Sequence, residues 1–253
     1  MAQFRTRSAR LIRSIQLSRL TKHLEFEVQG VARFGFVPGQ WLSVRATTSQ
    51  GEEITRAYSV VSAPSEGKEF AFCLNRVQGG FMSNYLCDLQ QGAEISFQGP
   101  FGDFILRPPL TDTVLIATGT GVAPFRSMLL ALFNQSAEHG PVRETTELPV
   151  VARAQHFWLL FGARFEQDIY YREDFKRIAA AQSNFHFMPT LSRGGPEWRG
   201  LRGYVQEHLR EVVGGRRDMQ AYICGLDKMV SVNRDLLGTL GWSRESIRYE
   251  NYD

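Results

Sequence analysis

The most distinctive stretch of the sequence is an apolar run that continues into a glycine turn, at residues 115–126. Gly119 and Gly121 have no Cβ atom, so the backbone can turn sharply there and let an anion approach the amide groups and the positive end of a following helix. Pro124 suits the first turn of that helix, where its missing N–H costs nothing. Gly119-Thr120-Gly121 is shorter than the full dinucleotide fingerprint. Taken alone, it fits either a phosphate site or a plain strand–helix turn.

A second candidate group is Arg56-Ala57-Tyr58-Ser59, which places a cation, an aromatic ring and a hydroxyl on a short β-like run. Arg56 and Tyr58 project from the same face of a strand. A guanidinium bound to a phosphate and a phenol stacked on a flat ring are therefore compatible. Ser59 projects to the opposite face of an ideal strand. The combination suits a flavin nucleotide, and the alternative is an ordinary barrel strand that carries these residues.

A third candidate is the turn Gly79-Gly80-Phe81-Met82-Ser83, which precedes a helix predicted near residues 80–89. Ser83 and the glycine amides at a helix N-terminus can form a second anion site. A helix that is simply capped explains Ser83 almost as well.

Two further candidates lie near the end of the chain. Cys224 and Gly225 follow a predicted strand, where the ligands of open parallel sheets collect, although a free thiol there is also a common small core residue. The final residues are Tyr249-Glu250-Asn251-Tyr252-Asp253. They offer a carboxylate and aromatic rings as candidate functional groups, or they form a frayed polar tail.

Length and composition limit the possible classes of protein. The chain has 253 residues, 43% of them hydrophobic, and suits two ordinary domains. No run of about 18 apolar residues is present to span a membrane. Three cysteines without C-x-x-C spacing and five scattered histidines predict no metal site. The basic N-terminus superficially suggests a transit peptide, but it leads into a β-rich segment without a cleavable linker.

The two halves of the chain show different patterns. Residues 8–108 alternate apolar and polar positions in short runs, which predicts an antiparallel β-barrel or sandwich. The expected strands are 9–17, 23–28, 40–47, 54–61, 69–77 and 93–98. After Pro108-Pro109, strands at 114–117, 157–161, 185–188 and 221–224 alternate with helices at 122–134, 168–181, 203–213 and 227–240. This alternation predicts a parallel α/β sheet, with the chemistry in the crevice between the halves. Segment 135–154 is expected to be a mobile polar connection.

In this order, the motifs resemble the ferredoxin–NADP reductase superfamily, and most closely its plant-type members, from about residue 8 to the end. The resemblance implies an FAD-binding β-barrel domain at 1–108 and a Rossmann-like NAD(P)-binding α/β domain at 109–253. It implies that Gly80, Phe81, Met82 and Ser83 contact the FAD pyrophosphate, which favours FAD over FMN.

The same resemblance implies a catalytic set of Ser59, Cys224, Glu250 and Tyr252. Ser59 belongs near the flavin N5, which requires the ring to cross the end of its strand. The pair Cys224-Gly225 lies against the nicotinamide, and Tyr252 covers the flavin with the Glu250 carboxylate beside it. Asp253 extends beyond the usual terminal aromatic residue of the family.

The choice of nicotinamide cofactor depends on cations and hydroxyls at the adenosine end, because NADP carries an additional 2′-phosphate. Ser192, Arg193, Arg202 and Tyr204 resemble the family's residues that bind this phosphate, so we expect NADP(H). The intervening residues 194–198 depart from the plant pattern and resemble NADH-using oxygenase reductases.

The expected function is therefore an FAD-dependent reductase that takes a hydride from NADPH and passes single electrons to a ferredoxin or flavodoxin-type carrier. The basic N-terminal strand and the net charge of +3 would steer an acidic partner. We expect a cytoplasmic monomer that binds no nucleic acid. The alternatives are an NADH-dependent reductase component of an oxygenase, and a non-catalytic flavin-binding redox sensor or interaction subunit.

Overall fold

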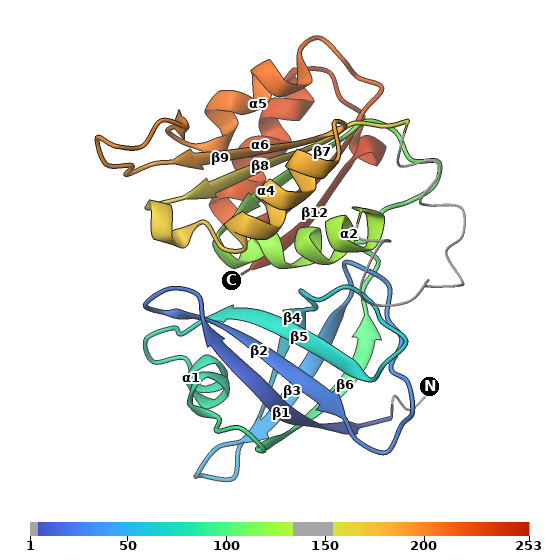
Figure 1. Ribbon diagram of the computed structural model, residues 1–253, viewed down its shortest axis with the longest axis vertical. Coiled ribbons are helices and arrows are strands. Elements are labelled where there is room, and N and C mark those ends of the chain that lie inside the picture. The colour runs from blue at the N-terminus through green and yellow to red at the C-terminus, as the bar shows by residue number, and fades with distance from the viewer. Residues whose placement is uncertain (1–4, 134–153, 253) are drawn as a thin grey trace.

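The computed structural model describes residues 5–133 and 154–252, which form a β-barrel domain below an α/β domain (Figure 1). The predicted connection at 135–154 lies almost entirely outside the described residues, as does Asp253. Within the described part, no helix is long and apolar enough to cross a membrane.

The N-terminal domain is a six-stranded antiparallel sheet in the order β4-β3-β6-β1-β2-β5. A bridge between Val60 and Phe72 brings the segment after β4 to β5, so the sheet curls towards closure. Its interior is filled by aromatic side chains such as Phe26, Phe70 and Phe97, which are all fully buried. The elements are β1 (Arg7–Gln16), β2 (Thr21–Val28), β3 (Trp41–Thr47), β4 (Glu53–Ser59), β5 (Glu69–Asn75), α1 (Phe81–Asp88) and β6 (Glu94–Phe101).

The C-terminal domain is a six-stranded parallel sheet in the order β10-β9-β8-β7-β11-β12. Its strands are β7 (Thr113–Thr118), β8 (Phe157–Ala163), β9 (Phe185–Leu191), β10 (Leu201–Arg202), β11 (Gln220–Leu226) and β12 (Ile247–Tyr252). The helices and 3₁₀ turns are η1 (Gly119–Val122), α2 (Ala123–Phe133), η2 (Glu166–Asp168), α4 (Arg172–Ala181), α5 (Val205–Val213), α6 (Asp227–Thr239) and η3 (Arg244–Ser246).

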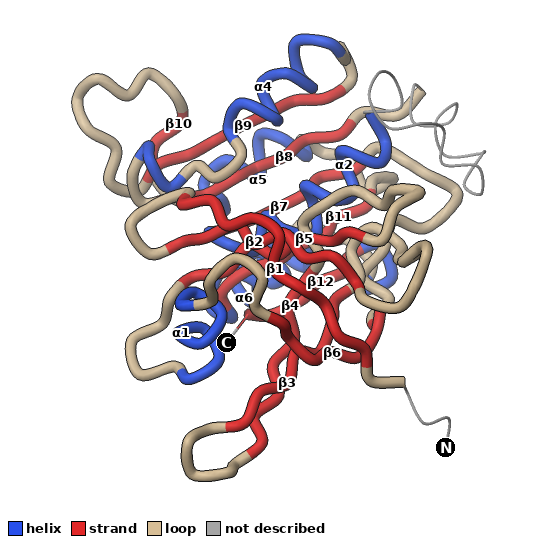
Figure 2. Tube along the Cα trace, turned by 60° about the horizontal axis from the view of Figure 1, so that its bottom comes forward, coloured by secondary structure: helices blue, strands red, loops and turns tan. Residues whose placement is uncertain are grey.

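Helices cover both faces of this sheet, as alternation along the buried strand β7 requires. Leu115 and Ala117 pack with α2 and α4, whereas Val114 and Ile116 pack with α5 and α6. Figure 1 shows that α2 lies between the parallel sheet and the barrel. In Figure 2, which is turned so that the barrel comes forward, the barrel strands overlap the α/β domain behind them.

The predicted fold class is confirmed, with three differences of detail. Residues 119–122 form the 3₁₀ turn η1 before α2 begins. The two-residue strand β10 and the C-terminal strand β12 were not predicted as strands, because both owe their conformation to pairing with a neighbouring strand rather than to an apolar run. The boundary proposed between residues 108 and 109 stays a prediction, and it falls in the connector 102–112 between β6 and β7.

Candidate active site

The glycine turn packs directly against the next strand of the sheet. A Cβ atom added to Gly121 would lie 2.3 Å from the carbonyl oxygen of Cys224 and 2.8 Å from the Cα of Gly225. Glycine is therefore required at residue 121 by contact with protein backbone, a reason that the sequence did not reveal. Gly119 has a φ of +55° and open space around its Cα, and Thr120 beside it is partly exposed. Pro124 is the second residue of α2, where it fits the first turn as predicted.

The end of β7 carries a polar group that sequence reasoning missed. The Thr118 Oγ1 atom is buried and has no hydrogen-bond partner among the residues that the structure describes. A Cβ atom on Gly225 would lie only 2.5 Å from this oxygen, so the hydroxyl lies against the turn at the end of β11. A buried hydroxyl without a partner is costly, which makes it a candidate ligand group. Its position at the end of an apolar strand, immediately before Gly119, was the available signal.

Strand register brings the predicted C-terminal residues to Cys224. In the parallel pairing of β11 with β12, Cys224 lies opposite Glu250 and Leu226 lies opposite Tyr252. Glu250 and Tyr252 are two residues apart and therefore share one face of β12. The frayed-tail alternative is wrong for residues 247–252, because they are paired along the sheet edge.

The electrostatics of this cluster favour neutral groups. The pKa of Glu250 is raised to about 7, mainly by burial and to a smaller extent by the charge of Asp103, whereas a hydrogen bond with Ser59 opposes the shift. Glu250 Oε2 is buried and has no hydrogen-bond partner in the described part of the chain. Burial also raises the pKa of the fully buried Cys224 thiol. This cysteine is therefore a small neutral side chain that lines the site, and it is not a thiolate nucleophile.

A hydrogen bond between the two domains completes the cluster. The Tyr252 hydroxyl donates to Ser59 Oγ at 2.6 Å. Ser59 is the last residue of β4 and is buried, whereas Arg56 and Ala57 on the same strand are exposed. The structure thus brings Ser59 of the N-terminal domain together with three residues of the C-terminal domain, Cys224, Glu250 and Tyr252.

The remaining barrel candidates lie along β4 and at the start of α1. Tyr58 packs on Phe72 with ring centroids 5.5 Å apart, and burial raises its pKa. The Arg56 guanidinium donates to the Thr55 carbonyl at 2.9 Å and remains exposed. A flat group lying along the open side of β4 would therefore meet both side chains.

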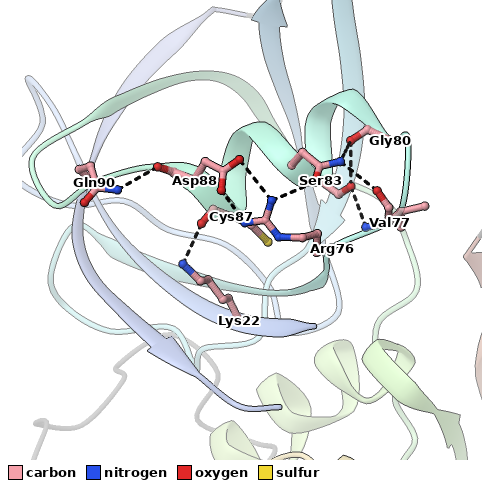
Figure 3. Close-up of polar contacts among 9 residues, drawn as sticks. Lys22, Arg76, Val77, Gly80, Ser83, Cys87, Asp88 and Gln90 are labelled. Atoms are coloured by element: carbon pink, nitrogen blue, oxygen red, sulfur yellow. Dashed lines mark hydrogen bonds and ion pairs between the residues drawn. The ribbon is translucent and has the colours of Figure 1, made fainter. Parts of the chain in front are cut away.

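Both hydrogen bonds of the Ser83 side chain are made within the turn that precedes α1. Ser83 Oγ accepts from the Val77 amide at 3.1 Å and donates to the Gly80 carbonyl at 3.2 Å (Figure 3). The helix cap is Gly80, and the Phe81 and Met82 amides follow it in the first turn. Ser83 therefore shapes this turn, and the backbone amides are the groups that face outwards from a helix start.

The candidates at the adenosine end lie on adjacent strand ends. Leu191 of β9 pairs with Arg202 of β10, so Ser192 and Arg193 emerge beside Tyr204. Arg193 and Tyr204 are exposed. The Arg202 guanidinium instead donates to three carbonyls of the preceding loop, those of Gly194, Gly195 and Trp198, at 2.8–2.9 Å.

The basic N-terminal strand is less positive than its sequence indicates. Arg10 pairs with Glu27 at 2.6 Å, and Arg13 pairs with Glu25 at 3.6 Å, because β1 and β2 are antiparallel neighbours. This pairing reduces the field that the strand can offer to an acidic partner. Among the described residues, no group of three or more His, Cys, Asp or Glu side chains could hold a metal ion.

Comparison with known proteins identifies the family. Residues 8–105 match the oxidoreductase FAD-binding domain family, and residues 115–235 match the oxidoreductase NAD-binding domain family. The chain is 40% identical to ferredoxin–NADP reductase B of Sorangium cellulosum (strain So ce56) over 100% of both chains. The chain belongs to the ferredoxin–NADP reductase family.

Other relatives of this ferredoxin–NADP reductase family member include electron transfer components of oxygenases. It is 28% identical to the toluate 1,2-dioxygenase electron transfer component of Pseudomonas putida over 94% of its own length, and it spans 65% of that component. The fold matches a ferredoxin NADP+ reductase from Neisseria gonorrhoeae with bound FAD and NADP, at a TM-score of 0.76, 22% identity and 99% coverage of each chain. It also matches the Amycolatopsis cytochrome P450 reductase, at a TM-score of 0.81 and 23% identity, covering 99% of this chain and 71% of that one.

Proposed function

We propose that the chain is an NADPH-dependent FAD reductase that passes single electrons to a ferredoxin or flavodoxin-type carrier. The observation that carries this proposal is the cluster of Ser59 with Cys224, Glu250 and Tyr252, because it joins the end of a barrel strand to the ends of two parallel strands. When bound, FAD supplies the chemistry, since a flavin accepts a hydride from a reduced nicotinamide and releases electrons one at a time. The protein supplies binding, orientation and electrostatics.

The residues present fit a flavin and a nicotinamide. We call the group Ser59, Cys224, Glu250 and Tyr252 the hydride end. Two buried polar atoms near it, Thr118 Oγ1 and Glu250 Oε2, lack partners within the described residues and can hydrogen-bond to a ligand. On the barrel side, Arg56 and the first amides of α1 would hold a pyrophosphate, with Tyr58 beside the flavin ring.

Within the hydride end, Glu250 would hold a proton beside the reacting centre, because its raised pKa keeps much of it protonated at neutral pH. Tyr252 would occupy the surface that nicotinamide must reach, with its hydroxyl tied to Ser59. Its ring must leave when nicotinamide enters, since two flat rings cannot share one stacking surface. Cys224 and Gly225 form the wall of this site.

The preference for NADPH rests on what we call the adenosine end, formed by Ser192, Arg193 and Tyr204. A guanidinium and two hydroxyls on adjacent strand ends suit a 2′-phosphate. Arg202 holds the 194–198 loop through three carbonyls, so we propose that it shapes this site in addition to any contact with the phosphate.

A second candidate is an NADH-dependent reductase component of an oxygenase. It is favoured by the 194–198 loop, which differs from the plant-type pattern, and by the similarity to the toluate dioxygenase component. Monomeric state and cytoplasmic location stay predictions.

The test compares NADPH and NADH as donors, with a ferredoxin, a flavodoxin and a cytochrome as acceptors, on protein loaded with FAD. We expect kcat/KM to be highest with NADPH and a ferredoxin or flavodoxin. Reduction of an acidic ferredoxin should slow as rising ionic strength screens surface charges. A preference for NADH would support the oxygenase alternative, and release of FMN instead of FAD on heating would overturn the flavin assignment.

A further inference from the structure

A partly buried network outside the hydride end connects the two domains through Arg126 of α2. The Arg126 guanidinium pairs with Asp174 of α4, with Nε 2.8 Å from Oδ2, and it also donates to the Val61 carbonyl of the barrel at 3.1 Å. The next residue, Ser127, donates to the Ser62 carbonyl at 2.6 Å. Two consecutive side chains of α2 therefore donate hydrogen bonds to two consecutive carbonyl groups of the barrel.

Tyr171 extends this network to strand β2 of the barrel. Its ring lies under Arg126, with the guanidinium carbon 4.4 Å from the ring centroid. Its hydroxyl is 2.9 Å from His23 Nδ1, and His23 Nε2 is 3.1 Å from Glu25 Oε1. The carboxylate of Glu25 can only accept, so the neutral imidazole donates from Nε2 and the Tyr171 hydroxyl donates to Nδ1.

The backbone of Tyr171 shows that its position is imposed by these contacts. Its φ is +56°, and it is the sole non-glycine residue with positive φ in the described chain. A bulky residue adopts this conformation only where its surroundings over-determine it. The residue precedes α4, so its side chain fixes the start of that helix against the barrel.

The network connects the segments that carry the proposed cofactor sites. Val61 and Ser62 follow Ser59 by two and three residues, and Arg126 and Ser127 follow the glycine turn within one helix. Any rotation of α2 against the barrel must break these contacts. The Thr21–Tyr170 hydrogen bond of 2.7 Å is a further contact between β2 and the segment that precedes α4.

We propose that Arg126 and Tyr171 are positioning residues for hydride transfer, which fix the glycine turn of the nucleotide domain relative to the flavin side of the barrel. This inference rests on the proposed function. Both residues act through the orientation of the domains and leave nucleotide affinity to other groups. Because a misplacement of about 1 Å can cost about a hundredfold in rate, loss of the network should lower the rate of the chemical step.

The test uses full-length protein loaded with FAD and compares Arg126→Gln and Tyr171→Phe with Arg177→Gln. Arg177 is a matched control because it also pairs with Asp174, at 3.2 Å, but its side chain is 70% exposed against 16% for Arg126. Tyr171→Phe keeps the ring under Arg126 and removes only the hydroxyl, so it is the milder variant. The rate of flavin reduction at saturating NADPH and the Kd of NADP+ are measured for each.

We expect Arg126→Gln to lower the saturating rate by about ten- to a hundredfold and Tyr171→Phe by about three- to tenfold, with the Kd of NADP+ unchanged within about twofold. Hydrogen–deuterium exchange should rise around residues 60–63 and at the start of α4 in both variants, and Arg177→Gln should match the wild type. Rates equal to that of Arg177→Gln, or a rise in Kd that accounts for the loss, would overturn the inference. A wild-type protein that NADPH does not reduce would instead overturn the proposed function.

Discussion

The two ends of the proposed nicotinamide site are built in opposite ways. At the hydride end, Cys224 is fully buried and its backbone packs against the backbone of Gly121. Tyr252 is hydrogen-bonded to Ser59 across the two domains. At the adenosine end, Arg193 and Tyr204 are exposed. Strand register fixes the hydride end, whereas long exposed side chains form the adenosine end.

This difference separates two tasks. The chemical step depends on sub-ångström placement, which buried strand ends and close glycine contacts can supply. Discrimination between NADPH and NADH depends on one phosphate, which exposed cations can bind with little effect on the rest of the fold. Substitutions at the hydride end should therefore change rate, stability or the binding of the nicotinamide ring, whereas those at the adenosine end should change only cofactor preference.

The largest effect is expected from Gly121→Ala. Its Cβ would lie 2.3 Å from the Cys224 carbonyl oxygen, and backbone must move to relieve that contact. We expect a loss of about 1–3 kcal/mol in the free energy of unfolding and a steep fall in the rate of flavin reduction. Gly195→Ala, in the adenosine-end loop, has no neighbour within 4 Å and no positive φ, so it is the control. Denaturant unfolding of both variants measures the contrast, and equal stability would contradict the tight packing of the hydride end.

Arg193→Ala should have the next largest effect, and only on one cofactor. Loss of a hydrogen bond to a charged phosphate costs about 1.5–3 kcal/mol, which corresponds to about ten- to a hundredfold in KM for NADPH. The KM for NADH and the stability should not change. Arg199→Ala, an exposed arginine that donates to the Pro196 carbonyl at 3.3 Å, provides the comparison. Equal effects of Arg193→Ala on both cofactors would place this residue away from the 2′-phosphate.

Tyr252→Ser should sharpen the contrast by opening the hydride end. Removing the ring would abolish the proposed stacking on the flavin, which is worth roughly 0.5–1.5 kcal/mol and competes with nicotinamide. It also breaks the hydrogen bond to Ser59. Titrations with NADP+ and NAD+ should show tighter binding of both, by about two- to tenfold, and weaker discrimination between them. If the affinities match those of the wild type, the ring does not cover the nicotinamide surface.

The smallest effect is expected from Glu250→Gln. Because burial raises the pKa of Glu250 to about 7, the protonated carboxyl predominates below that pH and is lost as the pH rises through it. The wild-type turnover should therefore fall with rising pH around 7. The amide preserves the shape of the side chain but cannot supply a proton, so the variant should lose this inflection. Its turnover should drop by about threefold, a change in activation free energy no larger than the net contribution of one hydrogen bond. An unchanged inflection would assign it to another group.

Sequence reasoning predicted the barrel, the parallel sheet and the order of the motifs, because these depend on local apolar periodicity and on glycine turns. It could not predict that β12 is an edge strand, since residues 247–252 have no apolar pattern and depend on register with β11. It also missed the contact of Gly121 with Cys224, the buried Thr118 hydroxyl and the contact of Arg126 with the Val61 carbonyl, because each arises between segments that are distant in sequence. The charge of the N-terminal strand was overestimated for the same reason, as its acidic partners lie on β2.

The most direct test is an anaerobic titration of the FAD-loaded protein with NADPH, followed through the visible absorbance of the oxidised flavin. We expect stoichiometric loss of that absorbance in the wild type, and the same end point in Arg193→Ala at a higher NADPH concentration. Gly121→Ala should be reduced slowly even at saturation. A flavin that stays oxidised in the wild type would contradict hydride transfer at this site and leave the chain as a non-catalytic flavin-binding protein.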